Sequence, residues 1–200
     1  MTVSRRFRWL AATAVAFLIV FGAYAQSIVG TFKDSRDGKT YKTVKVGGKT
    51  WMAENLNFAA EGSKCYENKN ANCAKYGRLY NWATALKACP AGFHLPSDDE
   101  WTALVNYAGG EEKAGKKLKS KAGWNDNGNG TDDYGWSALP GGSGSSDGSF
   151  YYAGISGNWW SATESSVVNA YNRYMYCSYE NVIRSYLSKT GLFSVRCVAD

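Results

Sequence analysis

Hydrophobic and polar residues alternate along two short segments that flank a pair of glycines. Apolar and polar positions exchange over Thr40–Val46 and again over Lys49–Met52, and Gly47 and Gly48 separate the two segments. A period of two residues is typical of a strand with one buried face, and a two-residue glycine turn joins antiparallel strands without steric strain. The pattern therefore predicts a β-hairpin within residues 39–56.

Two later segments carry apolar residues at the spacing of an amphipathic helix. In the first segment, the apolar residues at positions i, i+3, i+4 and i+7 are Leu79, Trp82, Ala83 and Leu86. These four side chains would form one stripe on a helix that runs to about Cys89, because Pro90 cannot continue it.

The second helical segment begins with a capping box. The hydroxyl of Ser97 and the carboxylate of Glu100 are spaced to satisfy two free backbone N–H groups of a first helical turn. The apolar spacing then repeats over Trp101, Leu104, Val105 and Ala108, and Gly109-Gly110 ends the pattern. We expect a helix that starts after Ser97.

The region between Gly123 and Gly157 is rich in Gly, Ser, Asn and Asp, yet aromatic residues interrupt it throughout. A flexible linker would not carry those aromatics, so we expect long loops within one domain. Short strands are predicted after this region, over Asn158–Thr163, Ala170–Tyr176, Val182–Leu187 and Phe193–Val198. Helices followed by antiparallel strands define an α+β fold.

The first 25 residues have the three parts of a secretory signal. Three arginines precede the uncharged apolar stretch Leu10–Gly22, and Ala23-Tyr24-Ala25 matches a small-x-small cleavage site before Gln26. A membrane anchor is the alternative, but the stretch is shorter than the roughly 20 residues that span a bilayer. We therefore predict a signal peptide over residues 1–25 and a single domain over residues 26–200, exported to the periplasm, the cell surface or the medium, without a membrane span after cleavage.

Charge and aromatic content narrow the class of ligand. The formal net charge of the chain is +6, and removal of the three signal arginines leaves +3, too small a surplus to indicate a nucleic-acid partner. Seven tryptophans and thirteen tyrosines remain after Trp9 and Tyr24 are removed with the signal. Such rings, apolar with a polar edge, suit half-buried surfaces and sugar-facing platforms as well as cores.

Five cysteines in an exported chain favour two disulfides and one free thiol. The short polar stretch between Cys65 and Cys73 would be closed by a local bridge. A metal site at this pair is disfavoured, since neither cysteine belongs to a C-x-x-C pair and the chain has a single histidine.

Four ordered motifs resemble the Fibrobacter succinogenes major paralogous domain family, a set of exported bacterial domains. These are Val46–Leu56, Cys89–Trp101, Trp159–Glu164 and Phe193–Val198. Phe93–Trp101 also resembles a strand-to-helix motif of the formylglycine-generating domains, which share one architecture with the C-type lectins. This resemblance implies a C-type lectin-like fold with two early helices, a twisted antiparallel sheet that joins both termini, and long loops on one side. It also implies a disulfide between Cys89 and Cys197, which leaves Cys177 free.

The resemblance does not imply a formylglycine-generating activity for this chain. Copper-dependent members need two closely spaced thiolates, whereas Arg173–Tyr179 supplies only Cys177. We expect Cys177 to be a buried small hydrophobe, with intermolecular disulfide bonding the alternative. His94 stands alone between Phe93 and Leu95, and a packed, hydrogen-bonded histidine is expected there rather than a catalytic one.

The loop region contains two sets of candidate binding residues. Aromatic candidates for an exposed ligand platform are Trp124, Tyr134, Trp136, Tyr151, Trp159 and Trp160. Trp159 and Trp160 would point to opposite faces of a strand, so at most one is expected in the core. Candidate calcium ligands are Asp126, Asn127, Asn129, Asp132 and Asp133, although turn-forming Asx and Gly chemistry is the favoured interpretation.

No acid/base pair or nucleophile constellation stands out in the sequence, so we expect no enzymatic activity and no cofactor other than the calcium just considered. The lysines after the second helix, at 113, 116, 117, 119 and 121, are expected on a solvated face. The favoured hypothesis is a non-catalytic binding or adhesion module that engages an extracellular carbohydrate or protein through its loops. The alternatives are a structural envelope component without a small ligand and, less favoured, a relative of the formylglycine-generating oxidases.

Overall fold

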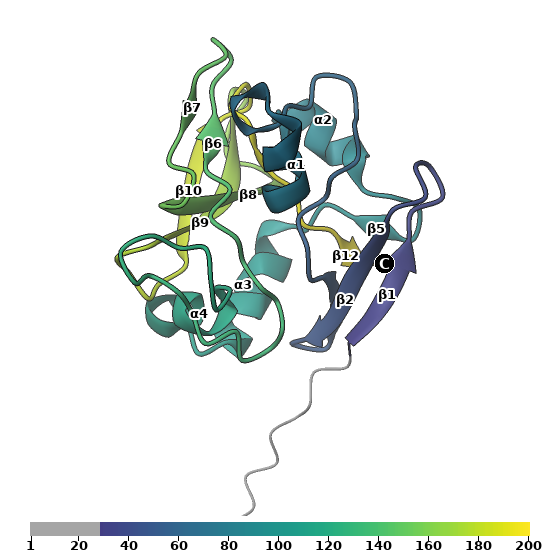
Figure 1. The fold of residues 1–200 in the computed structure, drawn as a ribbon. Helices are drawn as coiled ribbons and strands as arrows, with labels where there is room; N and C mark the ends of the chain where they lie inside the picture. Colours follow the sequence, from purple (N-terminus) through teal and green to yellow (C-terminus); the bar gives the residue numbers. More distant parts are fainter. Residues whose placement is uncertain (1–28) are drawn as a thin grey trace, which may run out of the picture.

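The computed structural model describes residues 29–200; the predicted signal peptide, residues 1–25, lies outside the described residues (Figure 1). The described part has an α+β fold with two five-stranded sheets. The first sheet, at the right of Figure 1, has the strand order β1 (Val29–Lys33), β2 (Thr40–Val46), β3 (Lys49–Met52), β12 (Val198–Ala199), β5 (Phe93–His94). The second has the order β10 (Ile183–Ser188), β9 (Asn169–Tyr176), β8 (Ser156–Glu164), β11 (Phe193–Ser194), β4 (Leu79–Tyr80). A small hairpin pairs β6 (Ser143–Gly144) with β7 (Phe150–Tyr151).

The helices lie at opposite ends of the molecule in Figure 1. The upper end carries α1 (Asn70–Tyr76) and α2 (Trp82–Ala88), and the lower end carries α3 (Asp98–Tyr107) and α4 (Glu111–Leu118). A short 3-10 helix, η1, precedes α1 over Tyr66–Asn68.

The last residues of the chain connect the two sheets. Strand β11 belongs to the second sheet and β12, four residues later, to the first. Between them, the carbonyl of Val195 accepts a hydrogen bond from Leu56 N at 2.8 Å, and the carbonyl of Cys197 accepts one from Met52 N at 2.9 Å. The predicted strand Phe193–Val198 is therefore one extended segment shared by two sheets, and the first and last strands lie in the same sheet.

The predicted hairpin and the second predicted helix are confirmed. Strands β2 and β3 pair in antiparallel register, and Gly47 and Gly48 adopt φ values of +60° and +82° in the turn. Such φ values favour glycine. At the start of α3, Ser97 accepts a hydrogen bond from the backbone N–H of Glu100, and the Glu100 carboxylate accepts one from the backbone N–H of Ser97.

The first predicted helix is correct in type but wrong at its start and in its buried face. Leu79 lies in β4, where it pairs with Ser194 of β11, and Asn81 caps the helix by accepting a hydrogen bond from Thr84 N. The buried face is Trp82, Ala85 and Ala88, while Ala83 and Leu86 are exposed. Because Leu79 pairs in a strand, the helix starts later and buries a different face from the one predicted. The helix packs against β8.

The lysine-rich segment is also not a uniform solvated face. It contains α4, and Lys119, which follows α4, is only 2% exposed. Its ammonium donates to the carbonyls of Tyr176 at 3.0 Å and Tyr179 at 2.7 Å and lies over the Trp124 ring. These partners come from distant sequence positions, so the local run of lysines gave no sign of them.

Strand β8 is buried on both faces. Trp159 packs in one hydrophobic cluster, with Trp51, Trp101 and Trp136, and Trp160 packs in the other, with Tyr80 and Phe193. Both rings are fully buried. The expectation that at most one of them reaches a core is wrong, because a hydrophobic cluster covers each face of the strand.

A buried arginine lies beside Trp159. Arg196 donates to Asn55 Oδ1 from Nη2 at 2.9 Å and to the carbonyl oxygens of Trp136 and Ser137, and its guanidinium stacks 3.8 Å from the Trp136 ring centroid. Asn55 Oδ1 also accepts the indole N–H of Trp159 at 2.8 Å. Complete burial lowers the pKa of Arg196 to about 9.

Both expected disulfides are present. Cys65 pairs with Cys73 across 8 residues, and Cys89 pairs with Cys197 across 108 residues. Cys177 is the free cysteine in the described part of the chain and is buried, as expected for a small hydrophobe. The bridge from the end of α2 to the segment before β12 ties the upper helix pair to the first sheet.

We predict that loss of the Cys89–Cys197 bridge is the more damaging. In the loop-entropy model, closing the longer loop stabilises the fold by about 4–5 kcal/mol and the shorter one by about 2.5 kcal/mol. Urea titration of the variant lacking Cys89 and Cys197 should give a lower free energy of unfolding than that of the variant lacking Cys65 and Cys73. Equal losses would contradict this ranking.

A polar cluster fixes the C-terminus against α3. His94 Nδ1 lies 2.6 Å from Asp200 Oδ1 and its Nε2 lies 3.0 Å from Glu100 Oε1, which also pairs with Lys49 at 2.7 Å. Burial alone would lower the pKa of His94, but the hydrogen bonds to Asp200 and Glu100 outweigh it and raise the pKa. His94 is hydrogen-bonded as expected, yet its side chain is 40% exposed rather than packed.

We predict a pH-dependent contribution of His94 to stability. Because its folded-state pKa is raised above the ordinary histidine value of 6.5, the contribution is complete below that pH and is lost as pH rises through the folded-state pKa. The midpoint temperature of thermal unfolding of His94→Gln should therefore lie furthest below that of wild type at about pH 6. The two midpoints should approach each other at about pH 8, since histidines titrate over this range. A difference that stays constant with pH would contradict this.

Candidate functional site

A cavity of about 270 Å³ lies on the second sheet where strands β8, β9 and β10 are not covered by the core. We call it the tyrosine cavity. Strands β8, β9 and β10 contribute most of its wall, and Ser143 of β6, Phe193 of β11 and the loop residue Tyr152 complete it. The lining residues are Ser143, Tyr152, Ser156, Asn158, Asn172, Tyr174, Tyr176, Ser185, Leu187 and Phe193.

Strand alternation brings these side chains to one face. Asn172, Tyr174 and Tyr176 occupy every second position of β9, so they point to the same side of the sheet. Cross-strand pairing sets Asn158 beside Tyr174 and Ser185 beside Asn172. The wall therefore follows directly from the register of three strands.

The tyrosine cavity is lined by uncharged residues throughout, with hydroxyl, amide and aromatic groups as its polar surface. Tyrosine hydroxyls both donate and accept, and asparagine amides offer two donors and one acceptor. An uncharged, strongly hydrogen-bonding lining with ring faces suits a neutral polar ligand better than an ion.

Asn172 is the most unusual group in the wall. Its side chain is 3% exposed, and its amide makes no hydrogen bond to any side chain or backbone group of residues 29–200. Since neither atom of the amide is fully buried, the amide opens to the cavity and can hydrogen-bond a ligand or solvent there. Neighbouring Asn158 donates from Nδ2 to Gly142 O at 3.2 Å and to Ser156 Oγ at 3.0 Å, which fixes its orientation.

Tyr152 forms the loop side of the cavity in a strained conformation. Its φ is +67°, which is uncommon for a bulky residue, and its carbonyl accepts hydrogen bonds from Ile155 N at 3.0 Å and Ser156 N at 2.9 Å. Its side chain is 56% exposed, and its ring lies 6.1 Å from the ring of Tyr151. The turn thus holds an exposed aromatic ring at the rim.

The predicted aromatic platform is largely wrong. Trp124, Trp136, Trp159 and Trp160 are all at most 4% exposed, because they pack in the two hydrophobic clusters. Tyr134 is half-buried and packs against Tyr107, outside the lining of the tyrosine cavity. None of the six residues lines the cavity; Tyr151 is exposed and its ring contacts that of Tyr152 at the rim.

The candidate calcium loop is organised by hydrogen bonds within the protein. Asn129 Oδ1 accepts from Trp124 N at 3.0 Å, and Asp132 accepts from the backbone and the hydroxyl of Ser137 at 2.7 and 2.5 Å. Asp126, Asn127 and Asp132 adopt positive φ. Among the described residues, no group of three or more His, Cys, Asp or Glu side chains is placed to hold a metal ion. These residues form turns, and the calcium interpretation is not supported.

Residues that the sequence analysis did not select form most of the cavity: Tyr152, Asn158, Asn172, Tyr174 and Tyr176. The alternation of Asn172, Tyr174 and Tyr176 in the predicted strand Ala170–Tyr176 was a usable signal, since it places three polar side chains on one face. The sequence did not indicate that this face would stay uncovered.

The fold and the cavity define a disulfide-bonded α+β domain with a polar, aromatic-lined hollow on one sheet. The chain belongs to the Fibrobacter succinogenes major domain family, whose model matches residues 44–199. Comparison of the chain with curated proteins and with solved structures gives no significant match. Over residues 29–200, no helix is both long and apolar enough to cross a membrane.

Proposed function

We propose that the protein is an exported, non-catalytic binding module whose tyrosine cavity holds a neutral carbohydrate. The observation that carries this proposal is the Asn172 amide, which opens to the cavity in an uncharged wall and has no hydrogen-bond partner within residues 29–200. A sugar hydroxyl can donate to and accept from that amide, and thereby satisfies hydrogen bonds that the protein itself leaves open.

The tyrosine rings supply the second part of the recognition. The faces of sugar rings carry C–H groups that pack on aromatic rings, while the ring hydroxyls reach groups at the edge. Tyr152 at the rim and Tyr174 in the wall offer such surfaces on two sides of the cavity. The third partner, Asn158, is already oriented by Gly142 and Ser156, so it loses little conformational entropy when a ligand binds.

The arrangement of the chain ends and the two disulfides support the same proposal. The first and last strands share a sheet, and a disulfide joins the end of α2 to the segment before the last strand. Two disulfides in one small domain are typical of proteins in oxidising compartments. These features match the exported lectin-like module that the sequence resemblance implies.

We predict that Asn172→Ala weakens carbohydrate binding about tenfold, the effect of losing about one hydrogen bond of 1.4 kcal/mol, without loss of stability. The amide makes no hydrogen bond within the described chain, so its removal should leave the free energy of unfolding within about 1 kcal/mol of wild type. Glycan arrays identify the sugar, and calorimetric titration of that sugar measures the affinity.

The matched control is Tyr186→Ala, which removes an exposed ring from the opposite face of β10. It should bind the sugar as wild type does. The proposal is wrong if no glycan binds, if a protein partner alone is captured, or if Asn172→Ala and Tyr186→Ala bind the sugar equally well.

A further inference from the structure

A second, larger cleft lies on the other side of the β6–β7 hairpin. Ser143 and Tyr152 line the tyrosine cavity, whereas Ser145 and Phe150 of the same hairpin region line this cleft of about 580 Å³, which we call the lysine cleft. The lining residues are Gly62, Lys64, Asn68, Asn81, Ala83, Ser145, Ser146, Gly148, Phe150, Lys189, Thr190 and Leu192.

The charge of the lysine cleft differs from that of the tyrosine cavity. Lys64 and Lys189 are its charged residues, and both are cationic. The Lys64 ammonium makes no hydrogen bond or ion pair with any group in the described part of the chain. Lys189 is fixed by Glu164 Oε1 at 2.9 Å and the carbonyl of Val167 at 2.8 Å, which use two of its three donors. The Lys189 ammonium also lies 4.6 Å from the centroid of the Trp82 ring, so Lys64 is the lysine of this cleft whose ammonium keeps its donors available.

Neutral donors and an apolar wall accompany the two cations. Asn81 Oδ1 accepts a hydrogen bond from Thr84 N at 2.9 Å, which fixes the amide, and its Nδ2 makes no hydrogen bond within residues 29–200. Phe150 lines the cleft with its ring packed against Tyr66 at 5.4 Å. The cleft thus combines cationic donors, an oriented amide and an aromatic ring.

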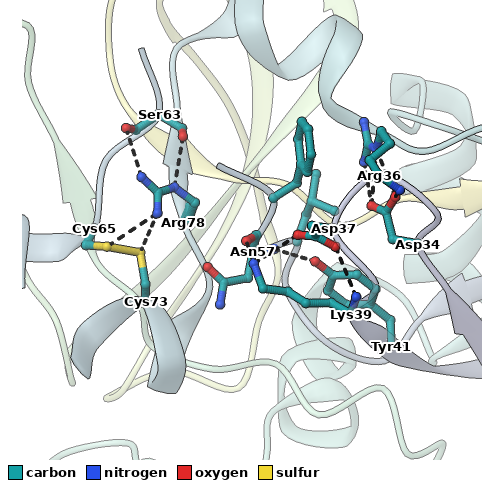
Figure 2. A network of polar contacts seen from close by, with 12 residues as sticks. Asp34, Arg36, Asp37, Lys39, Tyr41, Asn57, Ser63, Cys65, Cys73 and Arg78 are labelled. Carbon is teal, nitrogen blue, oxygen red and sulfur yellow. Dashed lines mark hydrogen bonds and ion pairs between the residues drawn. A yellow bond between two sulfur atoms is a disulfide. The ribbon is translucent and has the colours of Figure 1, made fainter. Parts of the chain in front are cut away.

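The wall that carries Lys64 is held on both sides (Figure 2). Arg78 donates to the hydroxyl of Ser63 at 2.9 Å and to its carbonyl at 3.4 Å, and its Nη1 contacts both sulfurs of the Cys65–Cys73 disulfide. These contacts fix the residues immediately before and after Lys64. A rigid backbone at this position reduces the entropy lost when a ligand binds.

We propose that the lysine cleft is a binding site for an acidic saccharide, one that carries a carboxylate or a sulfate ester on its rings. The acidic group pairs with Lys64, a hydroxyl accepts from Asn81, and a ring face packs on Phe150. A purely electrostatic anion site would not need the aromatic ring or the oriented amide. The site is separate from the tyrosine cavity and does not rest on its function.

Calorimetric titration with a short oligogalacturonate, and with the same oligosaccharide fully methyl-esterified, tests the proposal. We expect the acidic form to bind, with an affinity that falls as salt is added, and the ester to bind at least tenfold more weakly. Lys64→Gln should weaken binding of the acidic form about tenfold, equivalent to about 1.4 kcal/mol. Ala83→Trp should abolish it, because Ala83 is exposed on α2 and its replacement fills the cleft.

Matched controls separate the cleft from general charge and folding effects. Lys121→Gln removes an exposed lysine outside the cleft, and Leu86→Trp adds the same ring to another exposed position of α2; both should bind the acidic saccharide as wild type does. Asn172→Ala should also leave binding of the acidic saccharide unchanged. This result would show that the saccharide does not bind in the tyrosine cavity.

Three outcomes would overturn the proposal. The ester could bind as tightly as the acid, Lys64→Gln and Ala83→Trp could both bind like wild type, or oligoglutamate could bind as tightly as the oligogalacturonate. The last result would show that charge alone, without a sugar ring, accounts for the interaction.

Discussion

The buried guanidinium of Arg196 constrains the centre of the protein. Its side chain has no contact with solvent, so oxygen atoms of the protein must accept the hydrogen bonds that water would otherwise accept. Its hydrogen bonds go to neutral oxygens of Asn55, Trp136 and Ser137, which come from the segment after β3 and from the long loop region. One side chain on the segment between the sheets thereby fixes that loop and, through Asn55, the ring of Trp159. Displacement of any of these partners would leave the buried guanidinium with an unpaired donor in apolar surroundings.

The open part of the second sheet lies next to its buried tryptophans. Trp159 and Trp160 occupy the two faces of β8 within the cores, so β8 is covered at its centre. Earlier in the same strand, Ser156 and Asn158 lie beside Tyr176 and Tyr174 of β9, and these four residues line the cavity. The tryptophans thus supply buried apolar surface, while the neighbouring polar side chains border the hollow.

The β6–β7 hairpin separates two hollows of different chemistry. On one side the lining is uncharged and rich in hydroxyl and amide groups, and on the other it contains two lysines and an aromatic ring. Because electrostatic attraction and neutral hydrogen bonding select different ligands, the two hollows are suited to ligands of different charge. The disulfide next to Lys64 holds a wall of the lysine cleft, and the turn with positive φ at Tyr152 holds a wall of the tyrosine cavity.

Local spacing along the chain was enough to predict the Gly47-Gly48 hairpin, the capping box at Ser97, the late strands and the short disulfide. Features that depend on which surfaces pack against each other could be learned only from the folded molecule. The pairing of Leu79 with β11 moved the start of α2, and the two hydrophobic clusters covered the tryptophans that were candidates for an exposed platform. The site was missed for the same reason, since Asn172, Tyr174 and Tyr176 show their alternation in the sequence, but burial of a strand face is a property of the elements packed against it.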